Sequence, residues 1–107
     1  MLRYMVLVKT KDIFYMLPDE RRMVIQGAAM EFTDKLVKQK KLKEVHYMSP
    51  WNRYMMIAEV DSPEEAARLD LENPMRDYQD MESYELTEWA AHMKAMRETY
   101  QKLAVKR

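Results

Sequence analysis

One short stretch near the middle of the chain constrains the fold most, because it holds two strand patterns, a turn and a helix start. Residues 44–48 and 54–60 are rich in β-prone side chains, and turn-forming Ser, Pro and Asn lie between them. Ser62 can accept a hydrogen bond from the backbone amide of Glu65, whose side chain can reach back, and Pro63 suits the first helical position. The stretch therefore predicts strand, turn, strand and helix in direct succession.

The flanking segments supply the remaining elements. Residues 2–10 are apolar on both faces of a strand, which is typical of a central strand. Pro18 opens a helix, a second helix covers 63–72, and a further strand covers 81–86. The order β-α-β-β-α-β predicts an α+β fold with a ferredoxin-like antiparallel sheet.

The C-terminal part of the chain predicts an added helix. The 107 residues form one domain, with a core at 1–87 and this helix at 88–107. The helix carries a narrow apolar seam, which we name the α-seam, formed by Trp89, Met93, Met96, Tyr100 and Leu103. Such a stripe docks on a sheet or on a neighbouring subunit. Helices on one side of a small sheet leave the other face bare, so we expect a homodimer or a larger homo-oligomer.

Composition excludes several function classes. Lys plus Arg and Asp plus Glu both number 18, so zero net charge gives no electrostatic case for nucleic acid or an anionic membrane. The absence of cysteine excludes disulfides and thiolate metal sites, and a single glycine excludes glycine-rich phosphate loops. No segment is long enough to span a membrane, and the apolar run 4–8 is too short for a signal peptide. We expect a cytoplasmic protein with no cofactor.

Two titratable residues are candidates for acid–base catalysis. Strand alternation places His46 with Glu44 and Met48 on one face, and if that face is open His46 points into a cavity as a proton carrier. The alternative is a surface or hydrogen-bonded structural histidine. Glu31 lies beside the apolar stripe of the first helix and is the best-placed carboxylate, although solvated Glu is the default there.

Aromatic and amide residues near the central turn are candidates for ligand binding. Trp51, Asn52 and Tyr54 fit a pocket rim, with rings for an apolar ligand and an amide to orient it. The alternative is a turn anchored by its Trp. Tyr4 and Tyr84 carry hydroxyls that could bond to a ligand carbonyl or to each other. Metal binding has little support, because no HxH, HxxxH or HExxH spacing occurs.

The chain resembles the muconolactone isomerase-like families of the dimeric α/β-barrel superfamily over about residues 1–89. The resemblance rests on the Met-Leu-Arg-Tyr-Met-Val-Leu-Val-Lys start, the Pro-Asp-Glu helix opening at 18–20, the strand and helix start at 54–65, and the ending at 73–85. The segment 7–21 also looks like the darcynin family.

The resemblance implies two sheets paired into a barrel, with cavities for small, often aromatic-derived ligands. The isomerase family moves a proton on a lactone ring. Its helix acid aligns with Ala29 and its hairpin histidine with Trp51, so Glu31 and His46 would have to take their places.

These patterns lead to a functional expectation with open alternatives. We expect a small-molecule binding protein, with proton-transfer isomerisation of a small apolar or lactone-like substrate as the leading chemistry. The alternatives are a cofactor-independent or haem-dependent monooxygenase-type enzyme, with His92 as a conceivable haem ligand, and a non-catalytic ligand-binding or structural oligomer. Fold alone does not choose between them.

Overall fold

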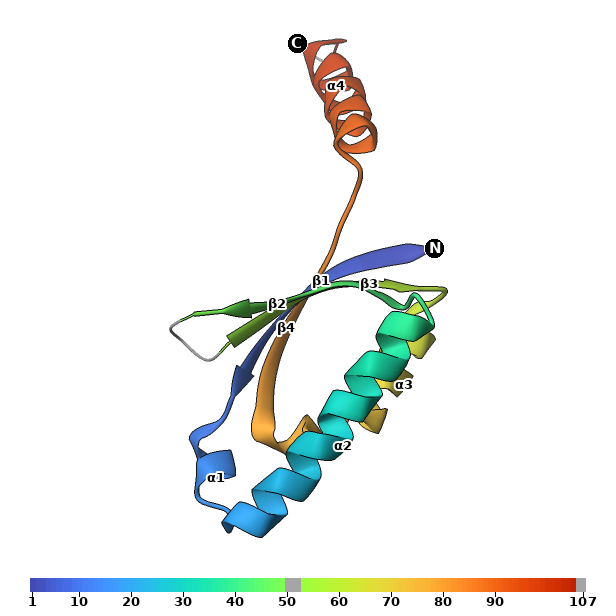
Figure 1. Ribbon diagram of the computed structural model, residues 1–107. Helices are drawn as coiled ribbons and strands as arrows, with labels where there is room; N and C mark the ends of the chain where they lie inside the picture. Colours follow the sequence, from blue (N-terminus) through green and yellow to red (C-terminus); the bar gives the residue numbers. More distant parts are fainter. Residues whose placement is uncertain (50–52, 106–107) are drawn as a thin grey trace.

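The computed structural model describes residues 1–49 and 53–105. Over these residues the chain forms a four-stranded antiparallel sheet with helices packed on one face, which confirms the α+β prediction (Figure 1). The elements follow in chain order: β1 (Leu2–Thr10), α1 (Asp12–Tyr15), α2 (Asp19–Lys38), β2 (Leu42–Met48), β3 (Arg53–Val60), α3 (Pro63–Glu72), η1 (Arg76–Tyr78), β4 (Gln79–Glu85) and α4 (Trp89–Val105).

The strand order of the sheet is β2-β3-β1-β4. β1 pairs with both β3 and β4, so it lies inside the sheet, as its two apolar faces predict. This arrangement is compatible with a ferredoxin-like fold. The last sheet strand begins two residues earlier than the sequence pattern indicates, because Thr10 pairs with Gln79.

The sheet has two chemically different faces, set by strand alternation. Tyr4, Val6 and Val8 of β1 lie on the face toward α2 and α3, which we name the helix face. Met5 and Leu7 lie on the other face, which we name the open face. In β2 a bulge shifts the register between Leu42 and Glu44. This irregularity keeps Leu42 and Val45 together on the helix face although three positions separate them.

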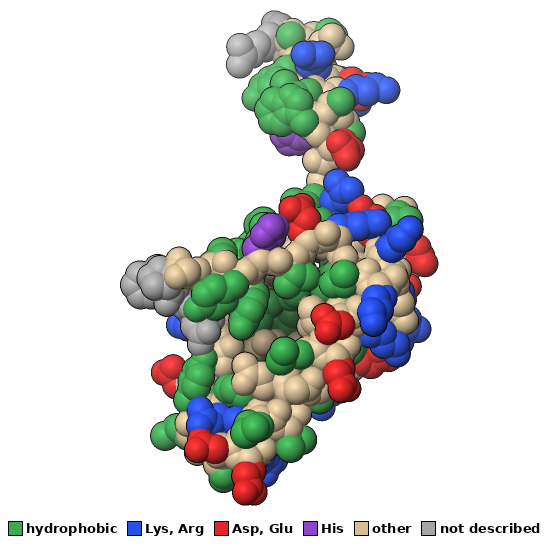
Figure 2. All heavy atoms as spheres, in the orientation of Figure 1, with side chains coloured by type: hydrophobic (Ala, Val, Ile, Leu, Met, Phe, Trp, Pro, Cys, Tyr) green, Lys and Arg blue, Asp and Glu red, His purple; other side chains and the backbone are tan. Residues whose placement is uncertain are grey.

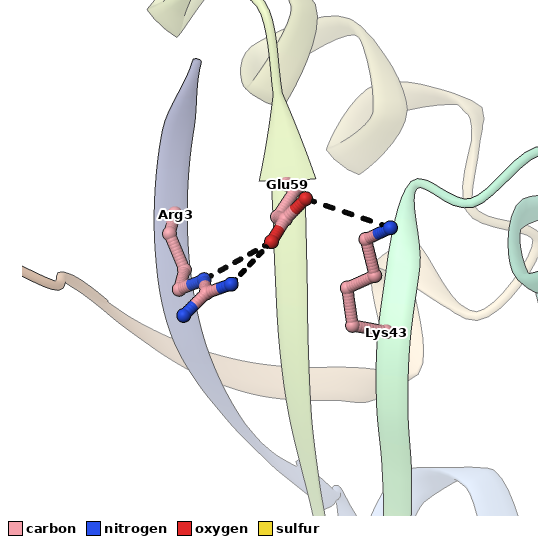
Figure 3. Close-up of polar contacts among 3 residues, drawn as sticks. All are labelled: Arg3, Lys43 and Glu59. Carbon is pink, nitrogen blue, oxygen red and sulfur yellow. Dashed lines mark hydrogen bonds and ion pairs between the residues drawn. The ribbon is translucent and has the colours of Figure 1, made fainter.

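Polar contacts across three strands cover one end of the open face. The Arg3 guanidinium on β1 donates to the Glu59 carboxylate on β3, with Nη2 and Oε1 2.5 Å apart. Lys43 Nζ on β2 lies 3.6 Å from the other carboxylate oxygen of Glu59, and Figure 3 shows all three side chains converging. The hydrogen bond from Arg3 is the main cause that holds the pKa of Glu59 below its usual value.

A small group of apolar side chains forms the buried core. They come from the sheet, α1, the C-terminal end of α2 and the connection before β4: Val6, Val8, Phe14, Leu36, Leu42, Val60 and Met75. Phe14 lies in the connection between β1 and α2, where the chain forms the one-turn helix α1. The centroid of the Phe14 ring is 5.8 Å from the centroid of the Tyr78 ring.

Helix α2 turns its apolar stripe toward the sheet without packing closely along its whole length. The stripe comprises Ile25, Ala28, Ala29, Phe32 and Leu36, and Leu36 is the one residue of α2 that is buried. Ala29 and Phe32 line a cavity, together with the polar side chains of Arg22, Gln26 and Thr33. Helix α2 therefore encloses a cavity lined by both its apolar stripe and neighbouring polar residues.

The start of α3 has the predicted Ser62 cap but lacks the predicted return contact from the Glu65 side chain. The Ser62 hydroxyl accepts a hydrogen bond from the Glu65 amide at 3.1 Å, and Pro63 occupies the first turn. The Glu65 carboxylate does not reach back. It lies 3.2 Å from Lys41 Nζ and ties the helix to the segment before β2.

Helix α4 lies apart from the rest of the molecule. Figure 1 shows it beyond the end of β4, on the side of the sheet away from α2 and α3. The molecule is elongated as a result, with extents of 66 × 28 × 23 Å. None of the described side chains of α4 is buried. In the described ranges 1–49 and 53–105, no helix combines the length and apolar character needed to cross a membrane.

Candidate functional site

A large open cavity lies between the helix face of the sheet and the helices that cover it. Its volume is about 1040 Å³, which is near the upper end of the range of ligand pockets. Figure 2 shows the hollow on the side of the molecule that faces the viewer, with apolar side chains inside it. The cavity exists because α2 meets the sheet closely at Leu36 and Leu42 but stands off elsewhere.

The floor of the cavity is apolar and comes from the two central strands. Val6 and Val8 of β1 and Met56 and Ala58 of β3 present their side chains there. Ala58 has the smallest side chain of the four, so it occupies the least volume of the cavity floor. An apolar floor of this size favours an apolar or aromatic ligand, because ligand transfer from water is then driven by buried apolar surface.

Hydroxyl groups lie at intervals around this apolar floor. Tyr4 and Tyr54 line the cavity, which agrees with their prediction as ligand-contacting residues without testing it. The Tyr54 ring packs edge-on against Tyr47 with centroids 5.5 Å apart, which holds it in place. The Thr33 hydroxyl already donates to the backbone carbonyl of Ala29 at 2.9 Å, so it has acceptor capacity left for a ligand donor.

Arg22 is the most notable polar group of the lining. Its Nη2 donates to the Asp19 carboxylate one turn earlier on α2. Its Nε is buried and has no hydrogen-bond partner among the described residues. A buried donor without a partner is costly, so this nitrogen is available to an acceptor that enters the cavity.

The two acid–base candidates lie away from this cavity. His46 lies on the open face, where its Nε2 is 3.1 Å from Glu44 Oε1 and its side chain is 53% exposed. Glu31 is exposed on α2 and does not line the cavity. The structure thus places the two residues on different surfaces, and their catalytic roles stay predictions.

The remaining ligand-binding candidates divide between two situations. Trp51 and Asn52 lie outside the described residues. Tyr84 lies opposite Met5 in the register and hence on the open face, so its hydroxyl and that of Tyr4 do not meet. Its hydroxyl instead donates to Glu82 at 2.8 Å, and this bond raises the pKa of Tyr84.

Sequence reasoning missed the polar wall on α2. Asp19, Arg22, Gln26 and Thr33 recur at helical spacing and reach the cavity, but polar residues at this spacing usually mark a solvated face. Within residues 1–49 and 53–105, no three His, Asp or Glu side chains gather as a metal site would require. Comparison with known proteins found no family model and no curated protein that matches this chain.

Proposed function

We propose that the protein binds a small apolar or aromatic molecule in the cavity between the sheet and α2. The observation that carries the proposal is the combination of about 1040 Å³ of space with an apolar floor and a few polar groups at its wall. Binding pockets for small molecules have this composition, since the apolar lining supplies affinity and the polar groups orient the ligand.

The polar groups suggest how a ligand would be oriented. The ring system would lie on Met56 and Ala58, and a carbonyl or hydroxyl could bond to the Tyr4 or Tyr54 hydroxyl. A stronger acceptor would find the unpartnered Nε of Arg22.

The test is a titration with a neutral, environment-sensitive apolar dye, such as Nile red. The variant Ala58→Phe fills the floor, and we expect it to raise the dissociation constant tenfold or more, about 1.4 kcal/mol of binding free energy. The matched control is Ile57→Phe, which adds a ring to the next residue on the open face. Equal dye binding by the two variants and the native chain would show that the cavity is not the binding site.

Proton transfer on a lactone-like substrate is a second proposal, favoured by the contact between His46 and Glu44. A carboxylate beside an imidazole orients the ring. This site would be enclosed only in an oligomer, when the open faces of two copies pack together as a dimeric α/β barrel. The open face offers the apolar side chains Met5, Leu7, Met55 and Ile57 for that contact.

A further inference from the structure

The α-seam is an apolar surface that its own chain does not cover. Trp89 is 73% exposed and Tyr100 62% exposed. Of the hydrogen bonds and ion pairs formed by the described residues, none joins α4 to the sheet domain. A helix of 17 residues is marginal alone in water and gains most of its stability from packing an apolar face. We therefore expect the α-seam to pack against a second apolar surface.

The mouth of the cavity offers a surface of matching length. Met23 and Met30 on α2 line the cavity and are 74% and 63% exposed, so they stand at its rim. Asp34, one turn further along α2, is also exposed and lines the cavity. The rim from Met23 to Asp34 is about 16 Å long, and the seam from Trp89 to Leu103 is about 21 Å long.

The charges of the two surfaces are complementary. Helix α4 carries the cations Lys94, Arg97 and Lys102 against the single anion Glu98, and none of these forms an ion pair within the described residues.

The cavity lining carries the opposite balance. Its carboxylates Asp19, Asp34 and Asp70 outnumber its cations Arg22 and Lys41. Asp34 and Asp70 have no ion-pair partner in the described part of the chain. A basic helix and an acidic rim attract each other and fix the docking direction.

A second copy provides this rim more readily than the same chain does. Helix α4 lies on the side of the sheet opposite α2 and α3 (Figure 1). The backbone amide of Leu86 still bonds to the Arg3 carbonyl at 2.8 Å, so only residues 87 and 88 are free to redirect the helix. From that point α4 reaches about 25 Å outward, comparable with the short dimensions of the molecule, 28 and 23 Å.

We infer that α4 of one copy covers the cavity mouth of a second copy, with its α-seam on Met23 and Met30 and its cations beside Asp34 and Asp70. In a two-fold dimer each copy donates one helix and receives one. The site is then complete only in the dimer, because the partner's helix limits access of water to the ligand. The inference rests on the proposed function to the extent that the covered mouth is the entrance of the ligand cavity.

Cross-linking tests the contact directly, because the native chain has no cysteine. Two single variants, Met96→Cys at the middle of the α-seam and Met30→Cys at the rim, are mixed in equal amounts and treated with a short bis-maleimide. We expect a heterodimer that contains one chain of each variant, identified by mass spectrometry. Because the two thiols are on different chains, this product can arise only from contact between copies.

Two control pairs locate the contact. Glu98→Cys lies on the side of α4 opposite the seam, and its pairing with Met30→Cys should give little product. Ile57→Cys lies on the open face, and its pairing with Met96→Cys should also give little. The inference is overturned if no mixed product forms, if the open-face pair reacts faster, or if Met96→Cys mainly links to itself through two helices α4.

A solution measurement separates this inference from the proposed function. Met96→Lys places a charge in the seam, and we expect a tenfold or larger rise in the dimer dissociation constant in analytical ultracentrifugation. The control Gln101→Lys adds the same charge to the same helix off the seam. Equal dissociation constants would overturn the inference. If dye binding survives without cross-linking, ligand binding stands and the α4 contact fails; if cross-linking occurs without dye binding, the reverse holds.

Discussion

His46 on β2 lies directly opposite Met55 on β3, and both side chains lie on the open face of the sheet. The next pair, Val45 opposite Met56, lies on the helix face and lines the cavity. Neighbouring residues of one hairpin thus serve two separate surfaces. Changes at His46 and changes in the cavity should consequently have independent effects.

His46→Ala is expected to leave both the melting temperature and dye binding in the cavity unchanged, because the exposed imidazole supports no core packing. If proton transfer is the activity, turnover of an identified substrate should fall by about 10²–10⁴-fold, the usual contribution of one acid–base group. Tyr54→Phe, which alters the cavity wall, is the comparison. Unchanged turnover in His46→Ala would remove this residue from the mechanism.

Phe14→Ala should destabilise the fold by about 3–5 kcal/mol, since it removes a buried ring and leaves a void. The ring is only 4% exposed and packs on Tyr78. Urea unfolding measures the change. Ile13→Ala, at an exposed position of the same short helix, should change stability by less than about 0.5 kcal/mol. Similar losses in both variants would contradict the buried position of Phe14.

Ser62→Ala should cost about 1 kcal/mol of stability, because the Glu65 amide loses its cap. Glu65→Gln tests a different contact, the ion pair with Lys41. A capping box would couple the two variants, whereas the observed contacts predict nearly additive effects. A strong coupling in the double-mutant cycle would show that Glu65 reaches Ser62 in solution.

The contact between Arg3 and Glu59 should make stability depend on pH in the acid range. The pKa of Glu59 is lowered from 4.5 by the hydrogen bond from Arg3, so the unfolded chain binds the proton more tightly. The stabilisation is therefore complete above the unfolded pKa and is lost as pH falls through the folded pKa. Melting temperatures measured between about pH 6 and pH 3 should fall less steeply for Glu59→Gln than for the native chain. The exposed Glu64→Gln is the control and should keep the native slope.

Removal of residues 88–107 should abolish the proposed dimer, because it deletes the whole α-seam. A large apolar side chain contributes about 1.5–3 kcal/mol when fully buried. The loss of the five α-seam side chains would therefore remove a large part of the free energy of association. Sedimentation at micromolar concentration measures this. The buried side chains of the described residues all lie within residues 6–75, so the shortened chain should still fold. A native chain that sediments as a monomer would contradict the prediction of an oligomer.

Much of the fold could be predicted because its signals are local. Alternation in β1, β-prone runs in β2 and β3, and the Ser62 cap each depend on a few neighbouring residues. The sequence patterns predict β4 and the start of α4 within two residues of their observed positions. The one-turn helix α1 was missed as an element, because four residues are too few to show a helical period.

The site was harder to predict because it depends on distances between elements. Tyr4 and Tyr54 reach the cavity through strand alternation, which the sequence shows. Arg22 reaches it because α2 encloses a cavity beside its apolar stripe, and no local pattern encodes the separation between α2 and the sheet. His46 was placed correctly on its strand face, but the face that holds the cavity is decided by where the helices pack.

The bulge in β2 absorbs one residue more than regular pairing with β3 requires. Leu42 and Val45 are three positions apart, and they share a face because Lys43 is the extra residue between two regular stretches of pairing. Deletion of Lys43 would therefore restore simple alternation and leave Leu42 and Val45 on the helix face. The deletion would remove only the bulge and the contact between Lys43 and Glu59. Homologues that lack position 43 are thus expected to keep the same side chains in the cavity.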